Sequence, residues 1–297
     1  MSLQSALRML TTHLVIALVA LVVIGGATRV MEAGLACPDW PLCYGSLLPG
    51  RQMNMQVFLE WFHRLDAFLV GLALLALVAV SLWGRRQLPS WLPWMFVLAV
   101  GLVLVQGILG ALTVTGLLAS STVTAHLATA LILLLLISGL DQALAGEVPS
   151  VSLPPWWLPL PWISTALVFA QCVLGASMAS RWAVDQCFTS GEMCEWVLRH
   201  RQLAWVAGLS ALAVAFSSLL LPRADGAIRA LAVSAAVLVG LQVSLGVLTL
   251  RTQLQLPSLT IAHQLVAALL MAHLGALCGR TFRAWAPAPS SMEVKCG

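Results

Sequence analysis

The sequence is poor in charge. Aspartate, glutamate, lysine and arginine make up only 9% of the 297 residues, while 60% are hydrophobic and the mean hydropathy is +0.96. In a soluble globular domain about a quarter of the residues are charged, so this composition excludes such a domain as the main body of the chain. The formal net charge of +4 does not indicate a nucleic-acid surface either. We expect an integral membrane protein, surrounded by lipid, with no nucleic-acid partner.

Long apolar runs take the place of charge. A helix needs about 20 apolar residues to cross a hydrocarbon core about 30 Å thick. Eight suitable runs lie at 10–28, 65–84, 93–115, 122–140, 160–180, 202–221, 229–250 and 258–279. The first could instead be a cleaved signal peptide, because Arg8 precedes it and small residues follow it, but its length favours a span. The expected fold class is an all-α integral membrane protein with eight transmembrane helices.

Basic residues distinguish the two sides of these spans only weakly. With both termini inside, the inner segments hold eight basic residues and the outer segments seven, which is a poor positive-inside signal. The short connections around Arg85 and Arg223 nevertheless resemble cytoplasmic turns. We therefore predict a multi-pass protein of the cell (plasma) membrane with both termini in the cytoplasm.

Two short cysteine loops then fall on the outer face. Cys37 and Cys43 lie six positions apart, and Cys187 and Cys194 lie seven apart. In an oxidising compartment, cysteines paired this closely indicate disulfides. A metal site is the alternative, but neither loop has a CxxC spacing or a histidine. Each pair is predicted to form a disulfide, and both a structural and a redox role stay open.

The chain also contains an internal repeat. The string QGILGALTV at Gln106 recurs as QVSLGVLTL at Gln242 and, in weaker form, as QCVLGASMA at Gln171. Such a repeat indicates a duplicated structural unit, and we interpret its glycines as close-packing positions between helices. We therefore expect two tandem four-helix bundles related by internal duplication, an N-terminal one at 1–145 and a C-terminal one at 146–297.

Four histidines follow the same repeat. His63 and His126 are 63 residues apart, and so are His200 and His263. Each of the four histidines lies near the start of a span that runs inward from the outer face. All four imidazoles should therefore lie at a similar depth in the membrane, near its outer surface. Facing histidines on neighbouring helices of a bundle can hold a haem by both axial positions. A lone intramembrane histidine would more simply be a hydrogen-bonding or proton-pathway residue, but duplicated pairs favour one ligated haem in each half.

Four arginines lie near these histidines, beside the ends of spans. Haem carries two propionates, and a guanidinium group binds a carboxylate through two parallel hydrogen bonds. The candidate propionate ligands are Arg29, Arg64, Arg181 and Arg201. The alternative is that these side chains extend to lipid headgroups.

The two halves differ just before the first histidine of each pair. Glu60 stands three residues before His63, whereas Val197 stands three residues before His200. The spacing places Glu60 on the helix face that carries His63. A carboxylate there could move protons or stabilise developing positive charge, although a helix-start role favoured by the dipole is the alternative. The asymmetry predicts a reactive first site and an electron-relay second site.

Together these motifs resemble the haem A synthase family. The resemblance rests on GGATRVMEAGLACPDWPLCYG, EWFHR, QGILGALTV and TAHLATA with their second-half counterparts, and it covers nearly all of the chain. Members of that family oxidise the C8 methyl group of haem O to a formyl group by successive hydroxylations, and they carry haem b as a cofactor. The resemblance implies that His63 and His126 border or ligate the haem O site, with Glu60 as the catalytic carboxylate. It further implies that His200 and His263 ligate haem b.

The resemblance also implies haem O as the substrate. The expected partners are the haem O synthase that would supply it and assembly factors of the terminal oxidase. Three other classes stay open from the residues alone. A dihaem electron carrier of the cytochrome b type would explain the histidines but not Glu60. A quinone-linked thiol oxidoreductase would explain the cysteine loops, and a haem transporter would bind porphyrin without changing it.

Overall fold

The computed structural model describes residues 2–145, 153–221 and 226–285. Within these ranges eight helices are long and apolar enough to cross a membrane, and no strand occurs in them. The long helices are α1 (Leu3–Val30), α2 (Met55–Trp83), α3 (Leu92–Thr115), α4 (Ser120–Leu144), α5 (Pro159–Ser180), α7 (Cys194–Leu220), α8 (Gly226–Arg251) and α9 (Pro257–Trp285). The prediction of an all-α, multi-pass membrane protein with eight spans is confirmed.

Two shorter elements join the long helices. The turn η1 (Arg85–Gln87) follows α2, and the seven-residue helix α6 (Ala183–Thr189) lies in the second cysteine loop. The helix α2 begins ten residues before the apolar run predicted for it, because the side chain of Asn54 accepts a hydrogen bond from the N–H of Val57 at 2.9 Å. This early start makes the polar segment EWFHR helical.

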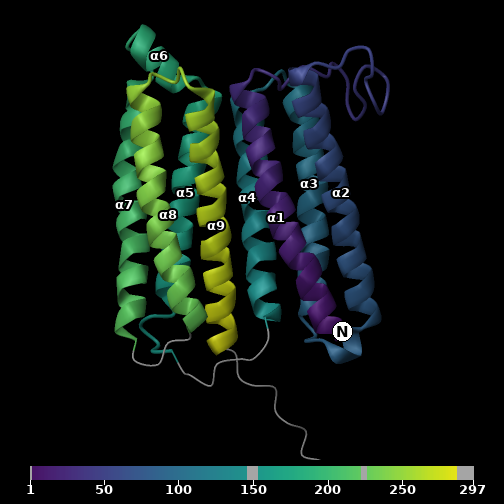
Figure 1. Ribbon diagram of the computed structural model, residues 1–297, viewed down its shortest axis with the longest axis vertical. Coiled ribbons are helices and arrows are strands. Elements are labelled where there is room, and N and C mark those ends of the chain that lie inside the picture. The colour runs from purple at the N-terminus through teal and green to yellow at the C-terminus, as the bar shows by residue number, and fades with distance from the viewer. Residues whose placement is uncertain (1, 146–152, 222–225, 286–297) are drawn as a thin grey trace, which may run out of the picture.

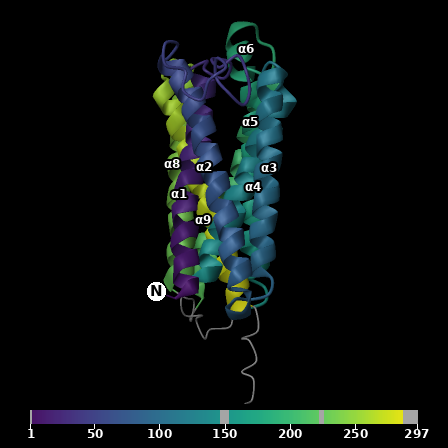
Figure 2. The ribbon, with the colours of Figure 1, turned by 90° about the vertical axis from the view of Figure 1, so that its right-hand side faces the viewer.

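The long helices stand in two groups of four (Figures 1 and 2). In the first group the packing neighbours follow the ring α1–α2–α3–α4, and in the second they follow the ring α5–α7–α8–α9. The two groups meet at the packed pair α4 and α9, and α1 also contacts α9 while α5 contacts α4. The first helix of each group thus contacts the last helix of the other group, α1 with α9 and α5 with α4. A duplicated unit would produce this pattern.

Glycine closes the seam between α4 and α9. A Cβ atom built on Gly275 would lie 2.7 Å from the backbone oxygen of Leu135, and one built on Gly139 would lie 3.3 Å from the backbone oxygen of Gly275. Backbone atoms cannot turn aside as a flexible side chain can, so the close approach requires glycine. Leu134 and Leu274 are completely buried nearby on the same two helices, so the molecular core includes this seam.

The two ends of the bundle carry different features. At one end, the Gln4 side chain of α1 donates to the backbone oxygen of Leu144 at 3.1 Å, and Arg283 of α9 donates to that of Ala143 at 2.9 Å. The loop 31–54 and α6 lie at the opposite end (Figure 1). Both cysteine loops therefore share one end of the molecule. Their predicted placement outside the cell stays a prediction.

Candidate functional site

The first pair of histidines faces across the first group of helices. His63 on α2 and His126 on α4 have ring centroids 6.4 Å apart, with ring planes at 69°. The two helices stand diagonally in their ring of four, as do α7 and α9, which carry His200 and His263. The prediction that each pair lies on directly neighbouring helices is therefore wrong. The diagonal placement arises because each helix packs chiefly on the helices before and after it in the ring.

Each histidine ring packs against a glycine on an adjacent helix. The nearest atom to a Cβ built on each glycine is the histidine Cε1. The pairs and distances are Gly25 and His63 at 2.9 Å, Gly110 and His126 at 3.6 Å, Gly175 and His200 at 2.9 Å, and Gly246 and His263 at 3.0 Å. Three of these glycines end the Q-x-x-L-G motif, which sequence reasoning treated only as helix packing. The motif instead contributes a seat for a histidine ring.

Glutamines of the same motif reach the histidines of the second group. Nε2 of Gln171 lies 3.1 Å from Nδ1 of His200, and Nε2 of Gln242 lies 3.1 Å from Nε2 of His263. Nδ1 of His263 also lies 3.1 Å from the backbone oxygen of Gln242. Contacts of this kind fix the orientation and tautomer of an imidazole ring.

The first pair keeps buried nitrogen atoms without partners. Nδ1 of His63 and Nδ1 of His126 are buried and make no hydrogen bond of normal geometry with the described residues. A buried polar atom without a partner costs about 1–3 kcal/mol, so the pair is suited to a ligand that imidazole nitrogens bind. Two imidazoles on opposite sides of one metal, each bonded at roughly 2 Å, have centroids about 6 Å apart. The observed separation is close to this value.

The kind of metal follows from the number of ligands. Among the described residues, no group of three or more histidine, cysteine, aspartate or glutamate side chains could hold a bare metal ion. Two histidines suffice only when the metal brings its remaining ligands with it, as haem iron does with the porphyrin nitrogens. The residues present therefore fit haem better than a free metal ion.

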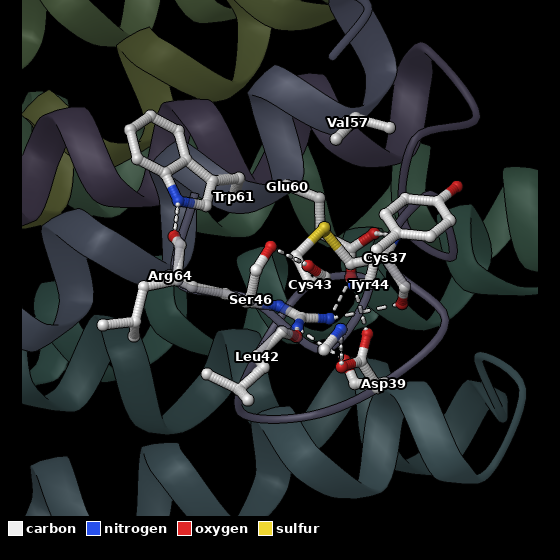
Figure 3. Close-up of a disulfide and its surroundings, with 12 residues drawn as sticks. Cys37, Asp39, Leu42, Cys43, Tyr44, Ser46, Val57, Glu60, Trp61 and Arg64 are labelled. Atoms are coloured by element: carbon white, nitrogen blue, oxygen red, sulfur yellow. Dashed lines mark hydrogen bonds and ion pairs between the residues drawn. A yellow bond between two sulfur atoms is a disulfide. The ribbon is translucent and has the colours of Figure 1, made fainter. Parts of the chain in front are cut away.

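Glu60 joins α2 to the first cysteine loop (Figure 3). Its side chain is buried, and one carboxylate oxygen accepts the backbone N–H of Cys37 at 2.8 Å. The other oxygen forms an ion pair with Arg64 at 2.5 Å. The spacing of four residues puts Glu60 and Arg64 on one helix face. Sequence reasoning missed the contact with Cys37, because it depends on how the loop folds back over the helix.

Arg64 is bound to the same loop (Figure 3). Besides Glu60, its guanidinium donates to the backbone oxygens of Asp39 at 2.6 Å and Leu42 at 2.5 Å. The carboxylate of Asp39 in turn accepts the backbone N–H groups of Tyr44 at 2.6 Å and Gly45 at 2.8 Å. These bonds, that from Gly45 foremost, lower the pKa of Asp39 below its usual value. Arg64 is thus an anchor of the loop, and its predicted contact with a propionate stays a prediction.

Both predicted disulfides are present. The S–S distances are 2.00 Å for Cys37 and Cys43 and 1.88 Å for Cys187 and Cys194. The first disulfide is buried with Val57 in a small apolar cluster, so the loop has a core of its own at the end of α2. Of the remaining cysteines, those on α5 and α9 are unpaired, and the one in the C-terminal tail lies outside the described residues.

The other three predicted arginines have different surroundings. Arg29 at the end of α1 donates to the backbone oxygen of Ala179 and lies 4.9 Å from the ring centroid of Trp182, so it reaches from the first group to the second. Arg181 lies 4.6 Å from the ring centroid of Trp196. Arg201 is exposed. None of these contacts tests the predicted binding of propionates.

The chain is similar to known proteins over most of its length. A family model described as cytochrome oxidase assembly protein matches residues 8–274. The "Heme A synthase" of Rhizorhabdus wittichii is 31% identical over 317 aligned positions, which cover 86% of this chain and 88% of that protein. The "Heme A synthase" of Shewanella oneidensis is 30% identical over 192 positions, covering 59% of this chain and 57% of that protein. A further 62-residue match, 40% identical, covers 13% of a "Protoheme IX farnesyltransferase" of Haloarcula marismortui.

Proposed function

Because the chain belongs to the haem A synthase family, a family of membrane oxidoreductases, we propose that it oxidises the C8 methyl group of haem O to the formyl group of haem A by successive hydroxylations. The observation that carries this proposal is the facing pair His63 and His126, whose buried Nδ1 atoms lack partners. Such a pair is suited to border or ligate a porphyrin that enters and leaves the protein. We assign haem O, the substrate, to this site and to the N-terminal half, residues 1–145.

The second pair is assigned to haem b, the cofactor, in the C-terminal half, residues 146–297. His200 and His263 would hold it, and the contacts from Gln171 and Gln242 support this assignment. When bound, haem b supplies one-electron redox chemistry beside the substrate site. Among the arginines, Arg29, Arg181 and Arg201 are the proposed partners for propionates, and Arg64 contributes by holding the loop.

Glu60 is proposed as the catalytic carboxylate. It is buried at the end of the first group that carries the cysteine loop, three residues before His63, and its charge is balanced by Arg64. A carboxylate in this position can accept and release protons during oxidation of the substrate. The corresponding position in the second half is Val197, which can do neither. This difference supports a reactive first site and an electron-relay second site.

Conversion of haem O by the purified protein tests the proposal. Full-length protein in detergent is supplied with haem O and a reductant in air, and the porphyrin products are separated by chromatography with mass detection. His63→Ala and His126→Ala should each abolish formation of haem A. His13→Ala is the matched control, because His13 is an exposed histidine on α1 and should leave conversion unchanged. Equal activity in all three variants would contradict the assignment.

The membrane orientation and the partners belong to the same proposal. Both disulfides lie at one end of the bundle, and disulfides persist in oxidising compartments. This supports a plasma-membrane protein with the cysteine loops outside and both termini in the cytoplasm. The haem O synthase that supplies the substrate and assembly factors of the terminal oxidase are the proposed partners.

A further inference from the structure

Each contact between a glycine and a histidine ring is here called a histidine seat, and the four seats are named by His63, His126, His200 and His263. The residues beside the ring differ between the seats of the two halves, and the inference from this difference rests on the proposed function. In each seat, one residue stands four positions before the glycine on the same helix. That residue is Gln106, Gln171 or Gln242 in three seats, and Leu21 in the seat of His63. A leucine side chain has no polar atom to offer an imidazole ring.

In the second group, each glutamine amide lies against its histidine ring. Nε2 of Gln171 lies 3.1 Å from Nδ1 and 3.3 Å from Nε2 of His200, and the Oε1 atoms of Gln171 and Gln242 are buried without a partner. Nε2 of Gln171 also donates to the backbone oxygen of His200 at 3.0 Å, and Nδ1 of His263 lies 3.1 Å from the backbone oxygen of Gln242. Each of these glutamines thus contacts its histidine at more than one atom.

In the first group, Gln106 makes the same bond to the backbone oxygen of its histidine as Gln171 does, but its side chain has no hydrogen bond to the imidazole ring. Nε2 of Gln106 donates to the backbone oxygen of His126 at 2.8 Å and to the hydroxyl of Thr129 at 2.5 Å. The position that corresponds to Thr129, three residues after the histidine, is Val266 in the second half. Valine cannot compete for the amide, so Gln242 is free to reach His263. A single hydroxyl thus accounts for the different direction of Gln106.

We propose that Leu21 and Thr129 leave the first pair of histidines without glutamine partners so that the first site exchanges its haem, whereas Gln171 and Gln242 hold the second pair for a haem that stays. An amide that lies against a ligating imidazole fixes the orientation of the ring and so supports its bond to the metal. Retention suits a cofactor, and exchange suits a substrate that must leave as product. Gln171 and Gln242 are positioning residues, because they act through the histidines.

The test is the rate at which haem leaves each site. Full-length protein carrying alanine at one histidine pair is loaded with haem b at the other pair, and excess apomyoglobin captures the haem that is released, which is followed by absorbance. The second site should lose haem at least about tenfold more slowly than the first, since such partners typically change metal affinity 10- to 100-fold. Gln171→Leu and Gln242→Leu should each speed haem loss from the second site several-fold.

The reverse variants test the first site. Thr129→Val, which frees the amide of Gln106, and Leu21→Gln, which adds an amide beside His63, should each slow haem loss several-fold. Thr129→Ser keeps the hydroxyl and should behave as the parent. Gln202→Leu, at an exposed glutamine of α7, is the control for glutamine replacement.

Two results would overturn the inference, and they differ in what they say of the proposed function. If haem binds at both sites but all variants release it at the parent rate, the glutamines do not control retention, and the haem A synthase assignment is unaffected. If haem binds at neither histidine pair, both the inference and the proposed haem sites fail.

Discussion

Removal of the Glu60 carboxylate should open the first cysteine loop. In Glu60→Ala, the buried N–H of Cys37 loses its acceptor, which lies at 2.8 Å. A hydrogen bond to a charged group contributes about 1.5–3 kcal/mol. At 1.4 kcal/mol per factor of ten, its loss should raise the population of the open loop by roughly 10- to 100-fold. Loss of the ion pair adds little more, because Arg64 keeps the backbone oxygens of Asp39 and Leu42 as acceptors.

Hydrogen exchange measures this opening directly. Full-length protein in detergent is exchanged into D₂O, and deuterium uptake is followed in the peptide that contains Cys37. Glu60→Gln keeps a neutral acceptor for that N–H, so exchange should rise by no more than about tenfold. Comparing the two variants separates the support of the loop from the proposed chemistry, because both lack the charge but only Glu60→Ala lacks the acceptor.

The control is a second ion pair with the same spacing. Glu195 pairs with Arg199 four residues later, but both side chains are largely exposed, and exposed pairs contribute little to stability. Glu195→Ala should therefore leave exchange of both cysteine loops nearly unchanged. Unchanged exchange at Cys37 in Glu60→Ala would refute the reasoning, because it would mean that the carboxylate does not hold the loop closed.

Three further predictions concern the histidine seats, the central seam and the loop. Gly175→Ala places a Cβ 2.9 Å from Cε1 of His200, so it should weaken haem binding at the second site at least about tenfold, as titration with haem b would show. Gly275→Ala places a Cβ 2.7 Å from the backbone oxygen of Leu135 and should lower the free energy of unfolding by about 1–3 kcal/mol, measured by thermal unfolding in detergent. The folded-state pKa of Asp39 lies below its usual value of 3.8. The contribution of Asp39 to loop stability is therefore complete above that value and is lost as the pH falls through the lowered pKa. Over that range the hydrogen exchange of the Tyr44 N–H should rise relative to its intrinsic rate at the same pH.

Matched variants check each of these. A Cβ on Gly240 or Gly101 meets no atom within 4 Å, so Gly240→Ala should leave haem binding intact and Gly101→Ala should leave unfolding unchanged. Asp39→Asn should remove most of the pH dependence of the loop. If Gly175→Ala and Gly240→Ala had equal effects on haem binding, the packing argument would be contradicted. Equal effects of Gly275→Ala and Gly101→Ala on the free energy of unfolding would contradict it as well. A loop with unchanged pH dependence in Asp39→Asn would contradict the role of that carboxylate.

The sequence predicts the spans well because their signal is local. Apolar runs of membrane length specify helices without reference to distant residues. The observed helices extend beyond the predicted runs, and at the starts of α1 and α2 a polar N-cap, Ser2 or Asn54, begins the extension. The two disulfides were also predictable, since their cysteines are close in sequence. The diagonal placement of the histidine helices was not, because it depends on which helices pack together.

The surroundings of the candidate sites were less predictable. The spacing of Glu60 and Arg64 is visible in the sequence, but their use as anchors depends on the backbone direction of a loop folded over α2. The glycines of the repeat could have been matched to the histidines, since motif and histidine recur together in both halves. The diversion of Gln106 by Thr129 requires the contact between α3 and α4, which no local pattern reveals.

The central claim is that the two halves hold different haems and that the first is the reactive site. The most direct test is chromatography with mass detection of haems extracted from full-length protein purified from cells that make haem O. The account predicts haem b together with haem O or its oxidised products, and selective loss of haem b in His200→Ala/His263→Ala. Haem b as the sole haem, at two per chain, would contradict the account and favour a dihaem electron carrier.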